Sequence, residues 1–188
     1  LGIGVVALLA AALAGLILPP ALTALVGLVV LAAISGCLHL DGLADSADGM
    51  LSSRPRAEKL VIMRDSRIGA MGVIAIVFVL LGKYAALSTA PPARLAVLLL
   101  LMPLAGRCAI VLTMALLPYA RPEGGLGTLF YSPNTRQAAV LAAVLWLVLA
   151  AVVVLPAGLG SPALLAALVV PAGTVLLFAG WCRRSLGG

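Results

Sequence analysis

The chain concentrates its carboxylates in one polar stretch, residues 39–72, within an otherwise apolar sequence. Asp41, Asp45 and Asp48 follow one another at intervals of four and three residues, so on a helix they share one face. Like charges at this spacing repel one another and destabilise the helix. A bound divalent cation would offset the repulsion, because Mg²⁺ takes carboxylate oxygens and often bridges them to substrate phosphates. The spacing therefore predicts a metal site and, less specifically, phosphoryl transfer.

A second charged group follows in the same stretch, at Arg64, Asp65 and Arg67. We interpret Asp65 as a fourth metal ligand or a general base, flanked by two guanidiniums that suit phosphate groups. Gly69 and Gly72 come next, and glycine permits close approach of the backbone to a ligand. The alternative is an ordinary salt bridge at the membrane interface, which is a common and weak interaction.

Two further polar features lie at either side of this group. His39, the only histidine, lies off the face that the three aspartates share. It is either a proton acceptor or substrate contact, or a side chain that hydrogen-bonds to a neighbour, and both interpretations stay open. Residues 121–127 read RPEGGLG. Arg121 and the glycines can cover a nucleotide diphosphate, or the segment is only a flexible cytoplasmic loop, since glycine-rich patterns alone are weak signals.

The composition indicates what class of protein must position these side chains. Of the 188 residues, 64% are hydrophobic and 10% are charged, and the mean hydropathy is +1.25. This composition excludes a soluble domain and predicts an integral membrane protein that contacts the lipid bilayer. The net charge is +6, but the basic residues lie in short loops between apolar segments, so no nucleic acid partner is expected. We expect one multi-helix membrane domain, residues 1–188.

Long apolar runs divide the chain into about six predicted transmembrane helices. Each run has roughly 18 to 25 residues, enough for a helix to cross about 30 Å of hydrocarbon. The Asp-bearing helix is predicted to continue from the end of the second span, and a short helix at 53–63 is expected at the membrane surface. The predicted fold is an all-α membrane protein with a polar Asp/Arg-rich site after the second helix. The predicted spans are 1–18, 21–40, 69–88, 94–117, 137–156 and 162–182.

The basic residues predict the orientation of these helices. They gather in alternate connections, namely the polar stretch, the loop 118–136 and the segment after the last span. Connections rich in Lys and Arg stay on the cytoplasmic side of a membrane. We therefore expect a multi-pass protein whose Asp cluster faces the cytoplasm, where nucleotides are available.

Three segments of the chain, HLDGLADSADG, MRDSRIGAMG and YARPEGGLG, resemble the signature segments of the cobalamin synthase (adenosylcobinamide-GDP ribazoletransferase) family in content, order and spacing. The resemblance covers residues from about 20 to 186. It implies a bacterial inner-membrane enzyme that uses Mg²⁺ to join α-ribazole to adenosylcobinamide-GDP, with release of GMP and formation of adenosylcobalamin. The sequence leaves open whether the acceptor is α-ribazole or its 5′-phosphate. Family members usually begin earlier and continue further, so we also expect residues 1–188 to be a fragment that lacks N- and C-terminal segments.

The residue pattern and the resemblance together suggest a role for each polar side chain. The expected metal ligands are the aspartates Asp41, Asp45, Asp48 and Asp65. The expected ligands of the substrate are Arg64, Arg67, Arg121 and Gly69. Asp65 or Asp48 is expected to take the proton from the attacking ribose hydroxyl, and His39 is the further catalytic candidate.

Two other kinds of membrane protein are the alternatives. CDP-alcohol phosphotransferases also carry spaced aspartates at the cytoplasmic end of a helix, but they have Ala-Arg after the first Asp-Gly, whereas Ala44-Asp45 follows here. A cation transporter would hold carboxylates at mid-membrane in a broken helix, not at a helix end in a basic loop. The sequence leaves open whether the protein forms an oligomer or a complex with other cobalamin enzymes.

Overall fold

The structure is a computed structural model that describes residues 1–121, 123–124, 126–131, 134–155 and 161–187. Within these residues every regular element is a helix, so the prediction of an all-α protein is confirmed. Contacts divide the chain into two compact units, Leu1–Leu104 and Ala105–Gly188. The expectation of a single membrane domain stays a prediction.

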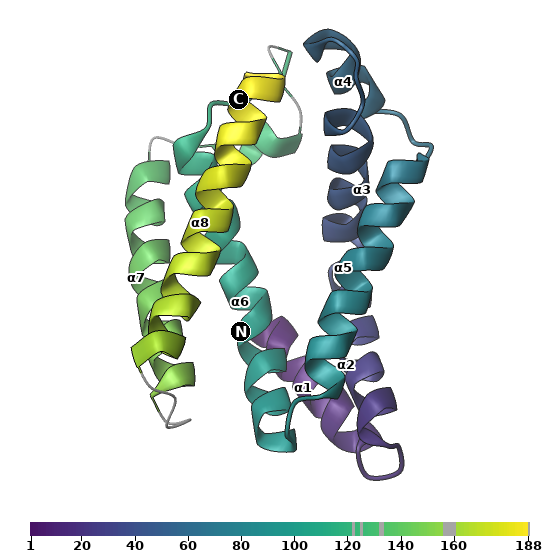
Figure 1. The fold of residues 1–188 in the computed structure, drawn as a ribbon, viewed down its shortest axis with the longest axis vertical. Coiled ribbons are helices and arrows are strands. Elements are labelled where there is room, and N and C mark those ends of the chain that lie inside the picture. Colours follow the sequence, from purple (N-terminus) through teal and green to yellow (C-terminus); the bar gives the residue numbers. More distant parts are fainter. Residues whose placement is uncertain (122, 125, 132–133, 156–160, 188) are drawn as a thin grey trace. The chain divides into compact units, whose positions relative to one another are not determined.

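The first unit brings the polar stretch together with the first helices (Figure 1). Prolines open α2 and α6, because their fixed φ suits the first turn of a helix, where an N–H is not needed. α2 packs against α1 and α5, and α3 packs against α4 and α5. The helices of this unit are α1 (Gly2–Ala14), α2 (Pro20–Ile34), α3 (Leu38–Met50), α4 (Arg56–Ile62), α5 (Ala70–Ser88) and the first part of α6 (Pro92–Leu116).

Small residues let these helices approach closely. A Cβ on Gly4 would collide with the backbone of Leu100, and a Cβ on Gly27 would lie 2.8 Å from the side chain of Leu99. Leu99 is fully buried at the centre of this core. The buried core cluster consists of Ala11, Ala24, Leu28, Leu87, Leu95 and Leu99.

The second predicted span is broken just before the aspartates. The sequence predicts that the Asp-bearing helix continues from this span, but α2 ends at Ile34, α3 begins at Leu38, and the two helices are bent by 83°. Gly36 and Cys37 both adopt the left-handed conformation, with φ of +58° and +57°. Two consecutive left-handed residues reverse the local twist of the chain and end a right-handed helix. α3 therefore follows α2 in the chain without being its straight continuation.

The described residues include four helices that are long and apolar enough to cross a membrane, α5 to α8, and a fifth span if the bent pair α2–α3 is counted as one. α1 has 13 residues, fewer than the roughly 20 that a span requires, because the chain leaves the helix at Ala14 before the Pro19-Pro20 turn. Many large apolar side chains point outward, and Ile17 is 86% exposed. Such surfaces favour hydrocarbon over water. The chain is a multi-pass membrane protein whose described residues include four or five candidate spans, and the number of six stays a prediction.

The second unit contains the remaining spans. The rest of α6 is followed by η1 (Leu126–Phe130), α7 (Thr135–Val154) and α8 (Ser161–Leu186). α7 and α8 agree closely with the spans predicted at 137–156 and 162–182. The end of α6 is tied to the following loop, because the Tyr131 hydroxyl donates to the Leu117 carbonyl at 3.2 Å. It is also tied to α8, because Arg183 Nη2 donates to the Leu116 carbonyl at 2.6 Å. These bonds satisfy carbonyls that a helix C-terminus leaves without partners.

Candidate active site

All three aspartates of the predicted cluster lie on α3. Asp41 is exposed in the first turn, where the helix dipole favours negative charge, while Asp45 and Asp48 are half-buried. The buried face of α3 consists of small or flexible residues, among them Ala44 and Ala47. Ala44 and Asp48 lie against the start of α5, whereas Asp41 and Asp45 belong to the part of α3 that faces solvent or is half-buried.

A cavity of about 510 Å³ opens beside α3 and the segment that joins α4 to α5. Three carboxylates and two guanidiniums line it, together with apolar residues such as Leu40 and Ile76. The charged side chains come from two segments of the polar stretch, Asp41 and Asp45 on α3 and Arg64, Asp65 and Arg67 in the connection between α4 and α5. The structure thus brings together five of the side chains named from the sequence: Asp41, Asp45, Arg64, Asp65 and Arg67.

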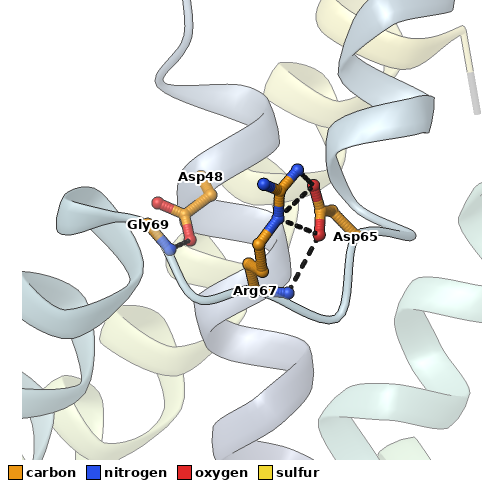
Figure 2. Close-up of polar contacts among 4 residues, drawn as sticks. All are labelled: Asp48, Asp65, Arg67 and Gly69. Atoms are coloured by element: carbon orange, nitrogen blue, oxygen red, sulfur yellow. Dashed lines mark hydrogen bonds and ion pairs between the residues drawn. The ribbon is translucent and has the colours of Figure 1, made fainter.

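Asp65 and Arg67 form a tight pair at this cavity (Figure 2). Asp65 Oδ1 accepts from the backbone N–H and from Nε of Arg67, both at 3.0 Å, and Asp65 Oδ2 accepts from Arg67 Nη2 at 2.7 Å. The guanidinium hydrogen bonds, followed by the backbone one, lower the pKa of the Asp65 carboxyl from 3.8 to about 2. The same pairing raises the pKa of Arg67. Arg67 is 87% exposed, so the pair stabilises the fold little but keeps Asp65 ionised.

Asp48 points to a different partner, the first turn of α5. Its Oδ2 accepts from the Gly69 N–H at 2.7 Å, and its Oδ1 accepts from the Gly72 N–H at 2.8 Å. Figure 2 shows the contact of Asp48 with Gly69 at one end of the segment whose other end carries the pair of Asp65 and Arg67. Asp48 is not among the residues that line the cavity. The close approach predicted for the two glycines is present, and it is made by a carboxylate of the chain itself.

The predicted four-aspartate ligand set is not assembled in the structure. Among the described residues, no three His, Cys, Asp or Glu side chains are grouped so that they could hold a metal ion. Mg²⁺, however, usually binds through one or two carboxylates, several waters and the phosphates of a substrate, not through an all-protein cage. The carboxylates of Asp41 and Asp45, which line the cavity from α3, therefore fit an ion that binds together with a diphosphate, and the four-aspartate set stays a prediction.

For two other candidates from the sequence, His39 and Arg121, the role stays a prediction. His39 is exposed on α3 and does not line the cavity. Arg121 belongs to the second unit, where it is half-buried, and neighbouring residues 122 and 125 lie outside the described residues. Its contact with substrate stays a prediction. Conversely, Cys37 lines the cavity and was not singled out from the sequence, although the Ser35-Gly36 pair before it is a turn signal.

The sequence matches the model of one protein family over its whole length. The sequence model of the family described as cobalamin-5-phosphate synthase matches residues 1–188. No solved structure matches the chain.

Several curated relatives carry the name adenosylcobinamide-GDP ribazoletransferase. The protein from Desulforamulus reducens is 45% identical over 126 residues, which are 64% of this chain and 51% of that protein. The protein from Syntrophobacter fumaroxidans is 42% identical over 172 residues, 92% of this chain and 67% of the relative. The protein from Klebsiella pneumoniae is 40% identical over 175 residues, 89% of this chain and 66% of the relative. The chain thus spans about half to two thirds of the length of these relatives.

Proposed function

Because the chain belongs to the cobalamin-5-phosphate synthase family, we propose that it carries the active site of an adenosylcobinamide-GDP ribazoletransferase. In this reaction a ribose hydroxyl of α-ribazole attacks the phosphorus on the corrinoid side of the diphosphate. A new P–O bond forms, the bond to GMP breaks, and the products are adenosylcobalamin and GMP. The observation that supports this proposal best is the cavity at which three carboxylates meet two guanidiniums.

The two arginines at the cavity are the proposed ligands of the diphosphate. A guanidinium presents a planar fork of N–H donors that matches phosphate oxygens. Arg67 is largely exposed and lines the cavity together with Arg64, so both can reach a ligand there. Gly69 donates its N–H to Asp48. We therefore assign phosphate binding to the two arginine side chains and not to the Gly69 N–H.

Asp41 and Asp45 are the proposed ligands of Mg²⁺, because their carboxylates line the cavity from α3. When bound, Mg²⁺ would neutralise charge on the diphosphate and on the leaving GMP. The carboxylates would hold the ion beside the phosphate oxygens that the two arginines bind. Oxygen ligands of this kind suit Mg²⁺ better than softer metals.

Asp65 is the proposed proton acceptor for the attacking hydroxyl. While it is paired with Arg67, its pKa of about 2 makes it a weak base. If Arg67 turns to the diphosphate, Asp65 loses the hydrogen bonds that lower its pKa, and the pKa rises toward 3.8. Substrate binding would then make Asp65 more basic when the hydroxyl arrives.

We also propose that the site lies at the cytoplasmic face of the membrane. The polar stretch between α2 and α5 carries Arg54, Arg56, Lys59, Arg64 and Arg67, which favours the cytoplasmic side of the membrane. A site at that face of the bacterial inner membrane would receive a nucleotide-activated corrinoid and α-ribazole, or its 5′-phosphate, from the cytoplasm.

Turnover by the full-length protein in liposomes tests the proposal. The protein is incubated with adenosylcobinamide-GDP, α-ribazole and Mg²⁺, and GMP and cobalamin are followed by chromatography. We expect Mg²⁺-dependent formation of both products and loss of activity in Asp45→Asn. The matched control is Glu58→Gln, because Glu58 is a carboxylate of the same polar stretch that pairs with Arg54 at the surface. Equal loss in both variants, or full turnover by Asp45→Asn, would contradict the role of the cavity.

The bend between α2 and α3 gives the transporter alternative one specific observation. A broken helix near carboxylates is a feature of ion-binding sites in transporters, and the pair α2–α3 is broken by 83°. Ion flux in the same liposomes without consumption of the nucleotide substrate would favour this alternative over the transferase.

A further inference from the structure

Asp48 satisfies backbone groups that α5 cannot satisfy alone. The first N–H groups of a helix have no partner within the helix, and a Ser, Thr, Asp or Asn at the N-cap normally accepts from one of them. The N-cap residue of α5 is Gly69, which has no side chain to do this. Asp48, on α3, accepts from the N–H of Gly69 and from that of Gly72, three residues later. These are the two donors that a capping box would satisfy.

The glycines are what admit this carboxylate. A Cβ on Gly69 would lie 2.7 Å from Cγ of Asp48, and a Cβ on Gly72 would lie 3.0 Å from Cβ of Ala44 as well as against Asp48. At both positions the Cβ would lie closer than 3.0 Å to the Asp48 carboxylate, a distance that real Cβ atoms essentially never show. The segment Gly69–Gly72 therefore lies directly on α3, with the negative charge of Asp48 at the positive end of the α5 dipole.

This contact fixes the two halves of the cavity relative to each other. α3 carries Asp41 and Asp45, whereas Asp65 and Arg67 belong to the segment that enters α5 at Gly69. Only residues 66–68 separate Asp65 from the glycine that Asp48 holds. The contact of α3 with Gly69 thus sets where Asp65 and Arg67 stand beside the carboxylates of α3.

We infer that Asp48 is a positioning residue, not a metal ligand: it caps α5 from α3 and thereby holds Asp65 and Arg67 at the cavity. Both oxygens of Asp48 accept backbone N–H groups, and the side chain does not line the cavity. The catalytic consequence rests on the proposed function, whereas the structural part of the inference does not.

A cap exchanged between the two helices tests the inference. Asp48→Ala removes the cap from α3. Gly69→Ser in that background gives α5 a cap of its own, because residue 69 has the extended conformation of an N-cap (φ −90°, ψ 173°) and the collision with Asp48 is gone. A serine hydroxyl at this place can accept from the Gly72 N–H but cannot replace a carboxylate as ligand of Mg²⁺. Hydrogen–deuterium exchange of residues 66–75 and Mg²⁺-dependent turnover are measured on the full-length protein.

The inference predicts that Asp48→Ala speeds exchange at Gly69 and Gly72 by about tenfold or more. In that background Gly69→Ser should recover about fivefold in exchange protection at Gly72, the amide that the serine hydroxyl can reach, and about fivefold in turnover. Alone, Gly69→Ser should lower turnover, because its side chain collides with Asp48. If Asp48→Ala does not fold, Asp48→Asn, which keeps one good acceptor oxygen, serves in its place and should lose protection at one of the two amides.

Two results would overturn the inference. One is unchanged exchange at Gly69 and Gly72 after removal of the Asp48 carboxylate. The other is restored protection without restored turnover in the double variant, which would make the carboxylate itself necessary for chemistry. If the unmodified protein makes no cobalamin, the proposed function fails instead, and the exchange data still decide whether Asp48 caps α5.

Discussion

Replacing Gly72 by alanine should loosen the contact of α3 with α5 far more than the same change at Gly82. Both glycines lie within α5, but a Cβ on Gly72 would meet Asp48 and lie 3.0 Å from Cβ of Ala44, whereas nothing lies within 4 Å of a Cβ on Gly82. Overpacking of this kind costs about 1–3 kcal/mol. Loss of the hydrogen bond from the Gly72 N–H to an ionised carboxylate adds about 1.5–3 kcal/mol. The greater helix propensity of alanine returns about 1 kcal/mol at either position.

The net cost at Gly72 is therefore about 3 kcal/mol, or a factor of roughly 150 in the equilibrium for local opening. Native-state hydrogen exchange of the first two turns of α5 measures this factor directly. Gly82→Ala should leave the same amides unchanged or slightly slower. If the two variants exchange alike, α3 does not hold the start of α5 as the structure indicates, and the explanation of the Gly69–Gly72 segment is wrong.

Three further predictions concern other contacts. Arg67→Ala should raise the pKa of Asp65 from about 2 toward 3.8, measured by carboxyl ¹³C NMR. Because the pKa is lower in the folded than in the unfolded protein, the contribution of the pair to stability is complete above about pH 4 and is lost as the pH falls through about 2. Gly4→Ala should destabilise the first unit by about 2 kcal/mol, because its Cβ would collide with the backbone of Leu100. Gly2→Ala, with open space around it, should not change the midpoint of thermal unfolding in detergent. Tyr131→Phe removes the bond to the Leu117 carbonyl and should cost about 1 kcal/mol, seen as faster exchange of residues 119–121 and 126–131.

The helices that cross the membrane were predictable because hydropathy and proline turns determine them locally. The predicted span 69–88 corresponds to α5 at Ala70–Ser88, and the short helix predicted at 53–63 corresponds to α4 at Arg56–Ile62. The break between α2 and α3 was not predictable in this way. Cys37 adopts a left-handed conformation that is unfavourable for a residue with a Cβ, and hydropathy carries no information about it. Its location at the cavity, beside Asp41, is where such local strain is common.

Helical periodicity identified a shared face but could not identify a shared site. Asp41 and Asp48 are seven residues apart, which on α3 is about 10 Å along the helix axis. One Mg²⁺ ion with oxygen ligands at about 2.1 Å holds those oxygens within about 4 Å of each other. Aspartate side chains are too short to close that gap between two positions on one helix. Which of the aspartates face the cavity depends on where α5 packs against α3, and the spacing of the aspartates within α3 carries no information about that packing.

Two of the four aspartates have partners in the protein itself, so a cation is not needed to neutralise all four. Four aspartates in one polar stretch suggest four charges to be neutralised together, but the charge of Asp48 is met by two backbone N–H groups and the start of α5, and that of Asp65 is met by Arg67. Asp41 and Asp45 are the carboxylates of α3 that line the cavity, and we propose that they bind an ion there together with a diphosphate. One or two carboxylates are also what Mg²⁺ typically takes from a protein when a substrate phosphate completes its coordination. The aspartates on α3 thus have two different functions. Asp41 and Asp45 face the cavity, whereas Asp48 holds the start of α5, and the segment that leads into α5 carries the other half of the site.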